Sequence, residues 1–271
     1  MKCLRITSPA NPHLKEVISI LRRRPEGGER FFLIEGTHLV EMALDAGAGI
    51  KEVFFTGQFD AKEEGIKLLN RIADQDIRMA EVTDQILKKL ADTETPQGIV
   101  ALVKIQTKSL GDLALSSTPL LVVLDRIQDP GNLGTIIRTA DAAGADAVLL
   151  LPPTCDPFKQ KTIRSTAGSV FTIPVIQTDV DELGVFLLAA GIKLAVASSD
   201  APNTLFETDL NIPLALVFGN EARGVSIAIR ESAEIVLRVP VHGKAESLNV
   251  ASAVAVCIYE AVRQRLATSR S

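Results

Sequence analysis

The feature that most constrains the fold is a set of short, strongly apolar runs in the second half of the chain. They occupy residues 120–124, 147–151, 192–197, 214–218 and 235–239, and helical patterns separate them. Apolar runs with little alternation are typical of strands buried on both faces. Parallel strands need long crossover connections, usually helices, which then cover both faces of the sheet. The second half is therefore predicted to be an α/β domain built on a parallel sheet.

The first half alternates shorter strand and helix patterns. We expect strands at 31–34, 53–55 and 98–103, and helices at 14–21, 38–46, 64–74 and 83–90. Between residues 104 and 119, polar residues and turn formers break this periodicity. The sequence therefore predicts a smaller α/β domain at 1–106, a linker at 107–118 and a second domain at 119–271.

Composition excludes several classes of protein. With 46% hydrophobic and 23% charged residues, the chain of 271 residues is globular rather than disordered. The formal net charge of -4 provides no overall attraction for nucleic acid, so an RNA partner would need a local basic patch. Three cysteines and three histidines, widely spaced, supply neither a disulfide framework nor a metal site. We expect a cytoplasmic protein, without a metal, that neither enters a membrane nor is exported.

Ligands of open α/β sheets bind beyond the carboxyl ends of the strands. After the run 120–124, a Pro-Gly-Asn turn at 130–132 leads into a helix. Its apolar stripe leaves Arg138 off the buried face, so Arg138 is either a solvated arginine or a functional one. Asn132 is equally consistent with a turn residue. The Gly-x-Gly-x-x-Gly fingerprint is absent here, which disfavours a dinucleotide oxidoreductase.

Two further segments follow apolar strands, at 217–226 and 239–251. Gly219 carries no side chain and would let a ligand approach the backbone closely, although a turn glycine is the alternative. Ser247 is also an ordinary N-cap candidate for the last helix. That helix, which runs to about Arg265, is apolar around almost its whole circumference. A second subunit covering one face would bury it, so we expect a homodimer.

Together and in this order, the segments Asp-Pro-Gly-Asn-Leu-Gly with Arg138, Phe-Gly-Asn-Glu-Ala-Arg-Gly at 218–224, and Val-Pro with Glu-Ser-Leu-Asn-Val at 246–250 resemble the three motifs of the SpoU (TrmH) family. Members are S-adenosylmethionine-dependent RNA 2'-O-ribose methyltransferases. The first half looks like the substrate-binding domain of that family, related to ribosomal protein L30e, through residues 32–36 and 95–98. The resemblance implies a parallel-sheet methyltransferase domain with a deep C-terminal trefoil knot, the SPOUT class, through which the chain would form its homodimer.

The resemblance also implies the site. Its catalytic residues would be Arg138, Asn132, Glu221, Ser247 and Asn249. The residues that bind S-adenosylmethionine would be Phe218, Gly219, Asn220, Val239, Pro240, Leu248 and Asn249. A guanidinium is a poor base, so Arg138 would bind a phosphate and stabilise the developing alkoxide. Ala251 replaces a serine that many relatives carry, and it leaves these residues unchanged.

The RNA itself would be held by local positive charge. The expected contacts are Arg22, Arg23, Arg24, Arg30, Lys161 and Arg164, and we place the last two beside the active site. Few aromatic residues are free for base stacking, which favours recognition of RNA shape and backbone. We expect 23S ribosomal RNA as the substrate. Transfer RNA, a non-catalytic RNA-binding role and methylation of a base rather than a ribose remain alternatives.

Overall fold

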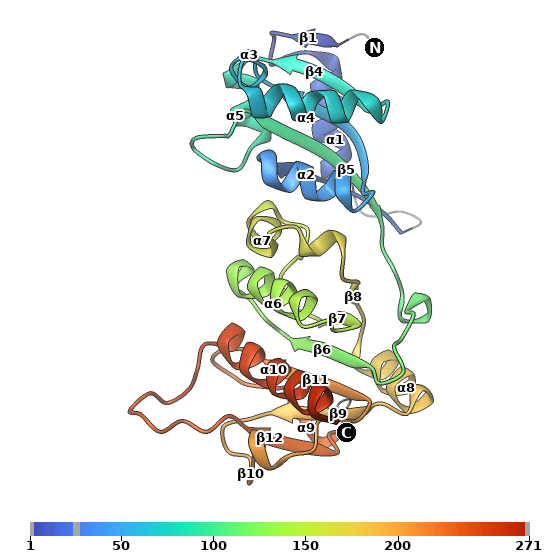
Figure 1. Cartoon of the computed structure of the whole chain (residues 1–271), viewed down its shortest axis with the longest axis vertical. Helices are drawn as coiled ribbons and strands as arrows, with labels where there is room; N and C mark the ends of the chain where they lie inside the picture. Colours follow the sequence, from blue (N-terminus) through green and yellow to red (C-terminus); the bar gives the residue numbers. More distant parts are fainter. Residues whose placement is uncertain (1–2, 24–27, 269–271) are drawn as a thin grey trace. The chain divides into compact units, whose positions relative to one another are not determined.

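The chain divides into two units in a computed structural model that describes residues 3–23 and 28–268 (Figure 1). Unit 1 contains Met1–Thr107 and Phe158–Phe171, and unit 2 contains Lys108–Pro157 and Thr172–Ser271. The sequence predicts residues 158–171 as part of the second domain. The structure instead groups this segment with unit 1, because its side chains pack into the core of that unit.

Unit 1 is built on a mixed five-stranded sheet with the order β1-β4-β3-β5-β2. Its strands are β1 (Leu4–Ile6), β2 (Glu29–Glu35), β3 (Gly49–Phe55), β4 (Arg78–Val82) and β5 (Ile99–Gln106). Strands β1, β4 and β3 are parallel, whereas β5 runs antiparallel to both β3 and β2. The helices are α1 (Pro12–Arg22), α2 (Thr37–Asp45), α3 (Gly57–Asp60), α4 (Glu63–Asp74), α5 (Asp84–Leu90) and α7 (Gln160–Thr166).

The segment 158–171 completes the core of unit 1. The ring of Phe158 stacks on Phe32 of β2 with a centroid separation of 5.3 Å, and Ile163 of α7 is 1% exposed in the same core. Gly168 adopts φ +97°, and a Cβ there would lie 2.9 Å from the Met42 side chain. Unit 1 thus depends on a segment that the chain supplies from between two strands of unit 2.

Unit 2 contains a seven-stranded sheet with the order β10-β12-β9-β11-β6-β7-β8, and every pair of neighbours is parallel. This confirms the predicted parallel sheet. The strands are β6 (Leu120–Asp125), β7 (Ala147–Leu151), β8 (Val175–Gln177), β9 (Lys193–Ala197), β10 (Asn203–Thr204), β11 (Leu214–Gly219) and β12 (Ile235–Arg238). The helices are α6 (Pro130–Ala142), α8 (Val180–Ala190), α9 (Ile227–Glu231) and α10 (Val250–Thr268). Short 3-10 turns occupy Leu110–Asp112 and Leu205–Glu207 in unit 2 and Ser169–Phe171 in unit 1.

Helix α10 packs against α6 and β11. Its C-terminal turn is fixed by Arg265, which donates hydrogen bonds to the carbonyls of Thr118, Pro119 and Ile212. The sequence predicts that this helix is buried on all sides. In the structure Val256, Tyr259 and Leu266 are 37%, 50% and 56% exposed, so an apolar stripe remains open on the outer face. The positions recur at helical spacing and lie on one side of the axis.

None of the three cysteines, all of which the structure describes, is in a disulfide, and they differ in environment. Cys3 is exposed, Cys155 is half-buried and Cys257 is buried in α10, where burial raises the pKa of its thiol to about 12. Within residues 3–23 and 28–268, no three His, Cys, Asp or Glu side chains are grouped so that they could hold a metal ion. No helix in that part of the chain is long and apolar enough to cross a membrane.

Candidate functional site

The carboxyl ends of β9, β11 and β12 surround a pocket of about 560 Å³ in unit 2. Eight of the predicted site residues line it: Phe218, Gly219, Asn220, Glu221, Val239, Ser247, Leu248 and Asn249. Pro240 lies between two lining residues, Val239 and Val241, without lining the pocket itself. The three loops that carry the motifs therefore converge on one cavity, whose volume suits a small organic ligand.

Three side chains from three distant segments are hydrogen-bonded in a row. Asn132, in the first turn of α6, donates from Nδ2 to Oε1 of Glu221 at 2.9 Å. Asn249 donates from Nδ2 to Oδ1 of Asn132 at 3.1 Å. The side-chain oxygen of Asn249 has a separate function. Its Oδ1 accepts the backbone N–H of Ala251 at 2.9 Å and so caps the N-terminus of α10. Asn132 thus links the loop after β11 to the start of α10.

Arg138 lies outside this row. It is exposed on α6, and Leu133, Ile136, Ile137 and Ala140 form the buried stripe of that helix, as the sequence predicts. Six residues separate Arg138 from Asn132, which corresponds to about 9 Å along the axis and a rotation of about 120°. In the described part of the chain, no ion pair or hydrogen bond connects Arg138 with Asn132, Glu221, Ser247 or Asn249. Arg138 is therefore not one of the residues that line the pocket.

The loop between β11 and α9 is held by two residues at the end of β6 that the sequence did not single out. Asp125 is 3% exposed, and its Oδ2 accepts the N–H of Ser226 at 2.6 Å. Arg126 has φ 63° and donates from Nη2 to the carbonyl of Gly224 at 3.2 Å. Asn220 returns a hydrogen bond to the carbonyl of Arg126 at 3.1 Å. The sequence did contain a signal for these two residues, because a carboxylate and an arginine stand directly at the end of an apolar strand.

Gly219 is also required by the packing of the chain itself. The close approach of a ligand to this glycine stays a prediction, and a Cβ at this position would lie 2.2 Å from the backbone carbon of Gly224 and 2.2 Å from the nitrogen of Val225. Real Cβ atoms do not approach backbone so closely. The missing side chain therefore makes room for the chain's own loop, and this packing shapes the pocket wall.

The loop after β9 forms the opposite wall and is anchored by charge. Ser198 and Ser199 line the pocket, and the hydroxyl of Ser198 donates to Oδ1 of Asp200. Arg230 of α9 donates to Oδ2 of Asp200 at 2.6 Å. The hydrogen bonds from Ser198 and then from Arg230 lower the pKa of Asp200 to about 2. Arg238 of β12 also donates to the carbonyls of Ala201 and Pro202, so both arginines fix this loop.

The pocket offers groups suited to a cationic, nucleoside-like ligand. Phe218, Val239 and Leu248 supply apolar surface, and Leu248 is 40% exposed. Glu221 and Glu246 contribute carboxylates that accept hydrogen bonds from hydroxyls and attract positive charge. Apolar walls with a few convergent polar groups are typical of cofactor sites.

The predicted RNA contacts fall in different environments, all within unit 1. Arg22 and Arg23 are exposed at the end of α1, whereas Arg24 lies outside the described residues. The guanidinium of Arg30 lies over the Phe158 ring at 4.9 Å. Lys161 is exposed on α7. Arg164 is half-buried there and lies 3.6 Å from a carboxylate oxygen of Asp92. Residues 161 and 164 belong to unit 1, whereas the pocket belongs to unit 2, and their position beside the active site stays a prediction.

Comparison with known proteins also divides the chain into two parts, but the match of the second part includes residues 158–171, which the structure groups with unit 1. Residues 119–259 match the SpoU rRNA Methylase family, and residues 11–101 match the MRM3-like substrate binding domain. An uncharacterized tRNA/rRNA methyltransferase of Synechocystis is 36% identical over 270 residues, which cover 97% of this chain and 95% of the relative.

Two further relatives are similar over nearly their whole lengths. A 23S rRNA (guanosine(2553)-2'-O)-methyltransferase of Bacillus subtilis is 35% identical over 94% of this chain and 97% of its own. The crystal structure of an AdoMet-bound rRNA methyltransferase from Sinorhizobium meliloti matches with a TM-score of 0.83 and 32% identity, over 96% of this chain and 97% of that one. This chain belongs to the SpoU rRNA methylase family.

Proposed function

We propose that this chain transfers a methyl group from S-adenosylmethionine to the 2'-hydroxyl of a ribose in 23S ribosomal RNA. The observation that carries the proposal is the hydrogen-bonded row of Asn249, Asn132 and Glu221 at the edge of the pocket of unit 2. It joins one residue of each family motif. The names of relatives of similar length, which methylate 23S rRNA at ribose oxygens, support the substrate.

The pocket residues would hold the methyl donor. We assign Phe218, Val239 and Leu248 to its adenosine, and the backbones around Gly219, Asn220 and Pro240 to its polar groups. When bound, S-adenosylmethionine supplies a sulfonium methyl group that the ribose oxygen can attack, with S-adenosylhomocysteine as the other product. Glu221 and Ser247 line the same cavity and would shape the end at which the ribose enters.

Arg138 would act on the RNA rather than on the donor. A ribose hydroxyl is a weak nucleophile at neutral pH, and its proton must leave during the reaction. Because a guanidinium keeps its proton, we assign Arg138 to the phosphate beside the reacting ribose and to the developing alkoxide, with the proton leaving to phosphate or water. Its exposed position on α6, away from the pocket lining, supports a contact with the larger substrate.

We further propose that the motif loops form a trefoil knot. The chain passes from β11 over β9 to β12, and then returns through residues 239–249 to place α10 against β11 and α6. Residues 218–224 and 239–250 line one cavity, which supports their threading. For unit 1, the mixed sheet and the match of residues 11–101 to a substrate-binding domain support an L30e-like fold that binds RNA.

The open stripe of α10 is the proposed dimer surface. Val256, Tyr259 and Leu266 are exposed apolar side chains on a helix whose other faces are buried. Burying them would gain about 25 cal/mol per Å² of apolar surface. Light scattering should give the mass of a dimer for the wild type, and Tyr259→Glu should shift it to the 29.0 kDa monomer. A wild-type monomer at micromolar concentration would contradict this surface.

The enzymatic proposal is tested by methyl transfer from labelled S-adenosylmethionine to RNA of a cell that lacks the gene. Ribosomal and transfer RNA are separated after the reaction, and the label in each is counted. Label in the large ribosomal RNA supports the proposal. Label in transfer RNA alone contradicts 23S ribosomal RNA as the substrate. Absence of both transfer and donor binding would identify a non-catalytic RNA-binding protein. Ribosomal RNA as substrate also implies a cytoplasmic location.

A further inference from the structure

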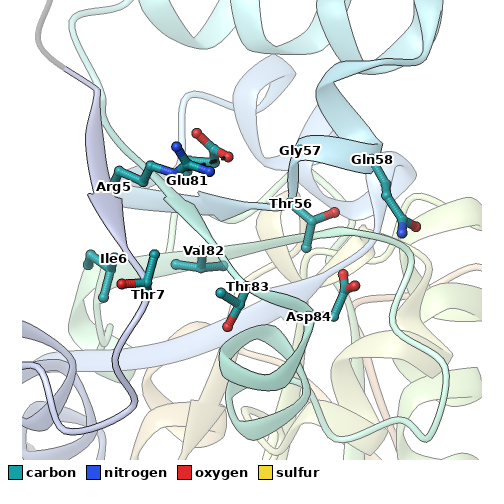
Figure 2. Close-up of a pocket in the computed structure, with 10 residues that line it drawn as sticks. All are labelled: Arg5, Ile6, Thr7, Thr56, Gly57, Gln58, Glu81, Val82, Thr83 and Asp84. Atoms are coloured by element: carbon teal, nitrogen blue, oxygen red, sulfur yellow. Dashed lines mark ion pairs between the residues drawn. The ribbon is translucent and has the colours of Figure 1, made fainter.

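Unit 1 has a crevice of about 420 Å³ at the carboxyl ends of its three parallel strands (Figure 2). It is lined by Ile6 and Thr7 at the end of β1, by Val82 and Thr83 at the end of β4, and by Thr56 directly after β3. This is the edge of a sheet at which α/β proteins place their ligands. Its volume is within the usual range for a small-molecule or nucleoside site.

Thr56 is a largely buried residue whose hydroxyl has no protein partner among the described residues. The residue is 4% exposed, and its side chain makes no capping hydrogen bond to α3, which begins at the next residue. Among the described residues no other partner contacts its hydroxyl. The hydroxyl is not one of the buried side-chain atoms that lack a partner, so it is open to solvent in the crevice. Thr56 therefore presents an unused donor and acceptor to the crevice that it lines.

A glycine keeps this hydroxyl accessible. Gly98 adopts φ +94°, and a Cβ there would lie 3.3 Å from the Thr56 hydroxyl oxygen and 3.0 Å from the Phe59 Cβ. The carbonyl of Gly98 also accepts the backbone N–H of Thr56 at 3.0 Å, and this hydrogen bond fixes the two residues next to each other. The Thr-Pro-Gln-Gly turn that precedes β5 thus ends on the residue that leaves room beside Thr56.

Further polar groups border the same space. Gln58 and Asp84 line the crevice, and in Figure 2 the Asp84 carboxylate is turned toward the side on which Thr56 and Gln58 lie. Neither side chain has a hydrogen-bond partner in the described parts of the chain. By contrast, Thr83 caps α5, and Arg5 lies 3.7 Å from Glu81. The unused groups are therefore a carboxylate, an amide and a hydroxyl.

A second hollow of about 280 Å³ continues from the crevice, because Thr56, Gln58 and Asp84 line both. It adds the ammonium groups of Lys62 and Lys88 and the turn of Pro96 and Gln97. Both lysines are exposed and form no ion pair with any described residue. A pocket with donors and acceptors beside two free cations matches the chemistry of a nucleotide: a base edge next to phosphates.

We infer that this crevice binds one unpaired guanine nucleotide of the RNA substrate, with its phosphates toward Lys62 and Lys88. The inference rests on the proposed function for the identity of the ligand as RNA. A carboxylate only accepts hydrogen bonds, and guanine presents two adjacent N–H donors, at N1 and N2, on one edge. Its neighbouring O6 requires a donor, which the Thr56 hydroxyl or the Gln58 amide supplies. Unpaired bases are read in this way in RNA.

The test measures binding of labelled RNA to the full chain by fluorescence anisotropy. One probe is a twelve-nucleotide oligouridine and the other carries a single central guanosine. The wild type should bind the second roughly ten-fold more tightly, since one bidentate base contact is worth that much or more. Thr56→Val, which keeps the shape of the side chain, and Asp84→Asn should both reduce the ratio toward one. Lys62→Gln should weaken both probes equally and reduce the salt dependence.

Asp181→Asn is the matched control. Asp181, like Asp84, is an exposed aspartate in the first turn of a helix, and it lies in α8 of unit 2. It should keep the guanosine preference, and circular dichroism should show that every variant is folded. Equal binding of the two probes by the wild type, or an unchanged ratio in Thr56→Val, would overturn the inference. Failure of excess free GMP to compete with the guanosine probe would also overturn it, because the crevice would then not bind a guanine nucleotide.

Neither result depends on methyl transfer. Guanosine preference in a chain that transfers no methyl group to any RNA would contradict the proposed function and leave the crevice supported. Methyl transfer by a chain that shows no guanosine preference would support the proposed function and contradict the crevice as a guanine site.

Discussion

Asn249 donates a hydrogen bond to Asn132 across 117 residues of sequence, at 3.1 Å between Nδ2 and Oδ1. The same Asn132 donates to Glu221 at 2.9 Å. Each amide group has one oxygen and one NH₂, so the order of donors and acceptors in this row is fixed once Glu221 is ionised. The row makes the position of the β11 loop depend on the position of the α10 cap.

Asn132→Asp should reverse one contact in this row. The new carboxylate would face the carboxylate of Glu221, where the native amide donates at 2.9 Å. A hydrogen bond to a charged group contributes about 1.5–3 kcal/mol, so we expect the kcat/KM of methyl transfer to fall by roughly 10- to 100-fold. Glu221→Gln keeps an acceptor and should lose less activity. Equal losses in the two variants would show that the hydrogen bond between them does not matter.

Gly219→Ala should destabilise the chain by about 2 kcal/mol or more, because the added Cβ would overlap backbone atoms of Gly224 and Val225 at 2.2 Å. Gly184→Ala is the control: a Cβ at this position in α8 meets nothing within 4 Å, so helix propensity should raise stability by about 0.5–1 kcal/mol. Urea unfolding measures both. A Gly219→Ala chain as stable as the wild type would show that the loop does not pack against this glycine.

Asp125→Ala should weaken binding of the methyl donor as well as stability. The substitution leaves the N–H of Ser226 without its acceptor, which costs about 1–3 kcal/mol. It also frees the loop that forms one wall of the pocket. Asp179→Ala removes the N-cap of α8 at a cost of about 1 kcal/mol, and it should leave donor affinity unchanged. Calorimetric titration with S-adenosylhomocysteine separates the two effects, and unchanged affinity in Asp125→Ala would contradict this role.

Asp200 gives a prediction for pH. Its pKa is lowered to about 2 in the folded chain, from an ordinary value of 3.8, by the hydrogen bonds from Ser198 and Arg230. A carboxylate whose pKa is lower in the folded chain stabilises the fold at pH values above its pKa in the unfolded chain. This stabilisation is lost as the pH falls through its pKa in the folded chain. The stability difference between wild type and Asp200→Asn should therefore be constant from about pH 5 to 7 and shrink between about pH 4 and 2. A difference that changes near neutral pH would contradict this assignment.

Much of the fold of unit 2 could be predicted because each strand carries its own signal. The apolar runs coincide with β6, β7, β9, β11 and β12, and the stripe on α6 is buried as its spacing indicates. Strands β8 and β10 have only three and two residues, too few to show a period. In unit 1, β4 mixes Arg78 and Glu81 with apolar residues, so its pattern is weak.

Long-range packing explains what the sequence could not show. The segment 158–171 has its own helical pattern, but nothing local indicates that Phe158 stacks on Phe32 of β2, far away in the sequence, and joins unit 1. Likewise, Arg126 and Gly224 are 98 residues apart, and their hydrogen bond follows only from the folded strand order. The motif residues could be named from the sequence, whereas the residues that hold their loops required the structure.

The central claim is transfer to a ribose oxygen, and analysis of the product nucleoside tests it most directly. Ribosomal RNA methylated with labelled S-adenosylmethionine is digested to nucleosides and analysed by mass, for the wild type and for Arg138→Ala. We predict label only in a 2'-O-methylnucleoside for the wild type. Arg138→Ala should give none while binding S-adenosylhomocysteine normally, since Arg138 does not line the pocket. Label on a base, or full activity in Arg138→Ala, would contradict the account.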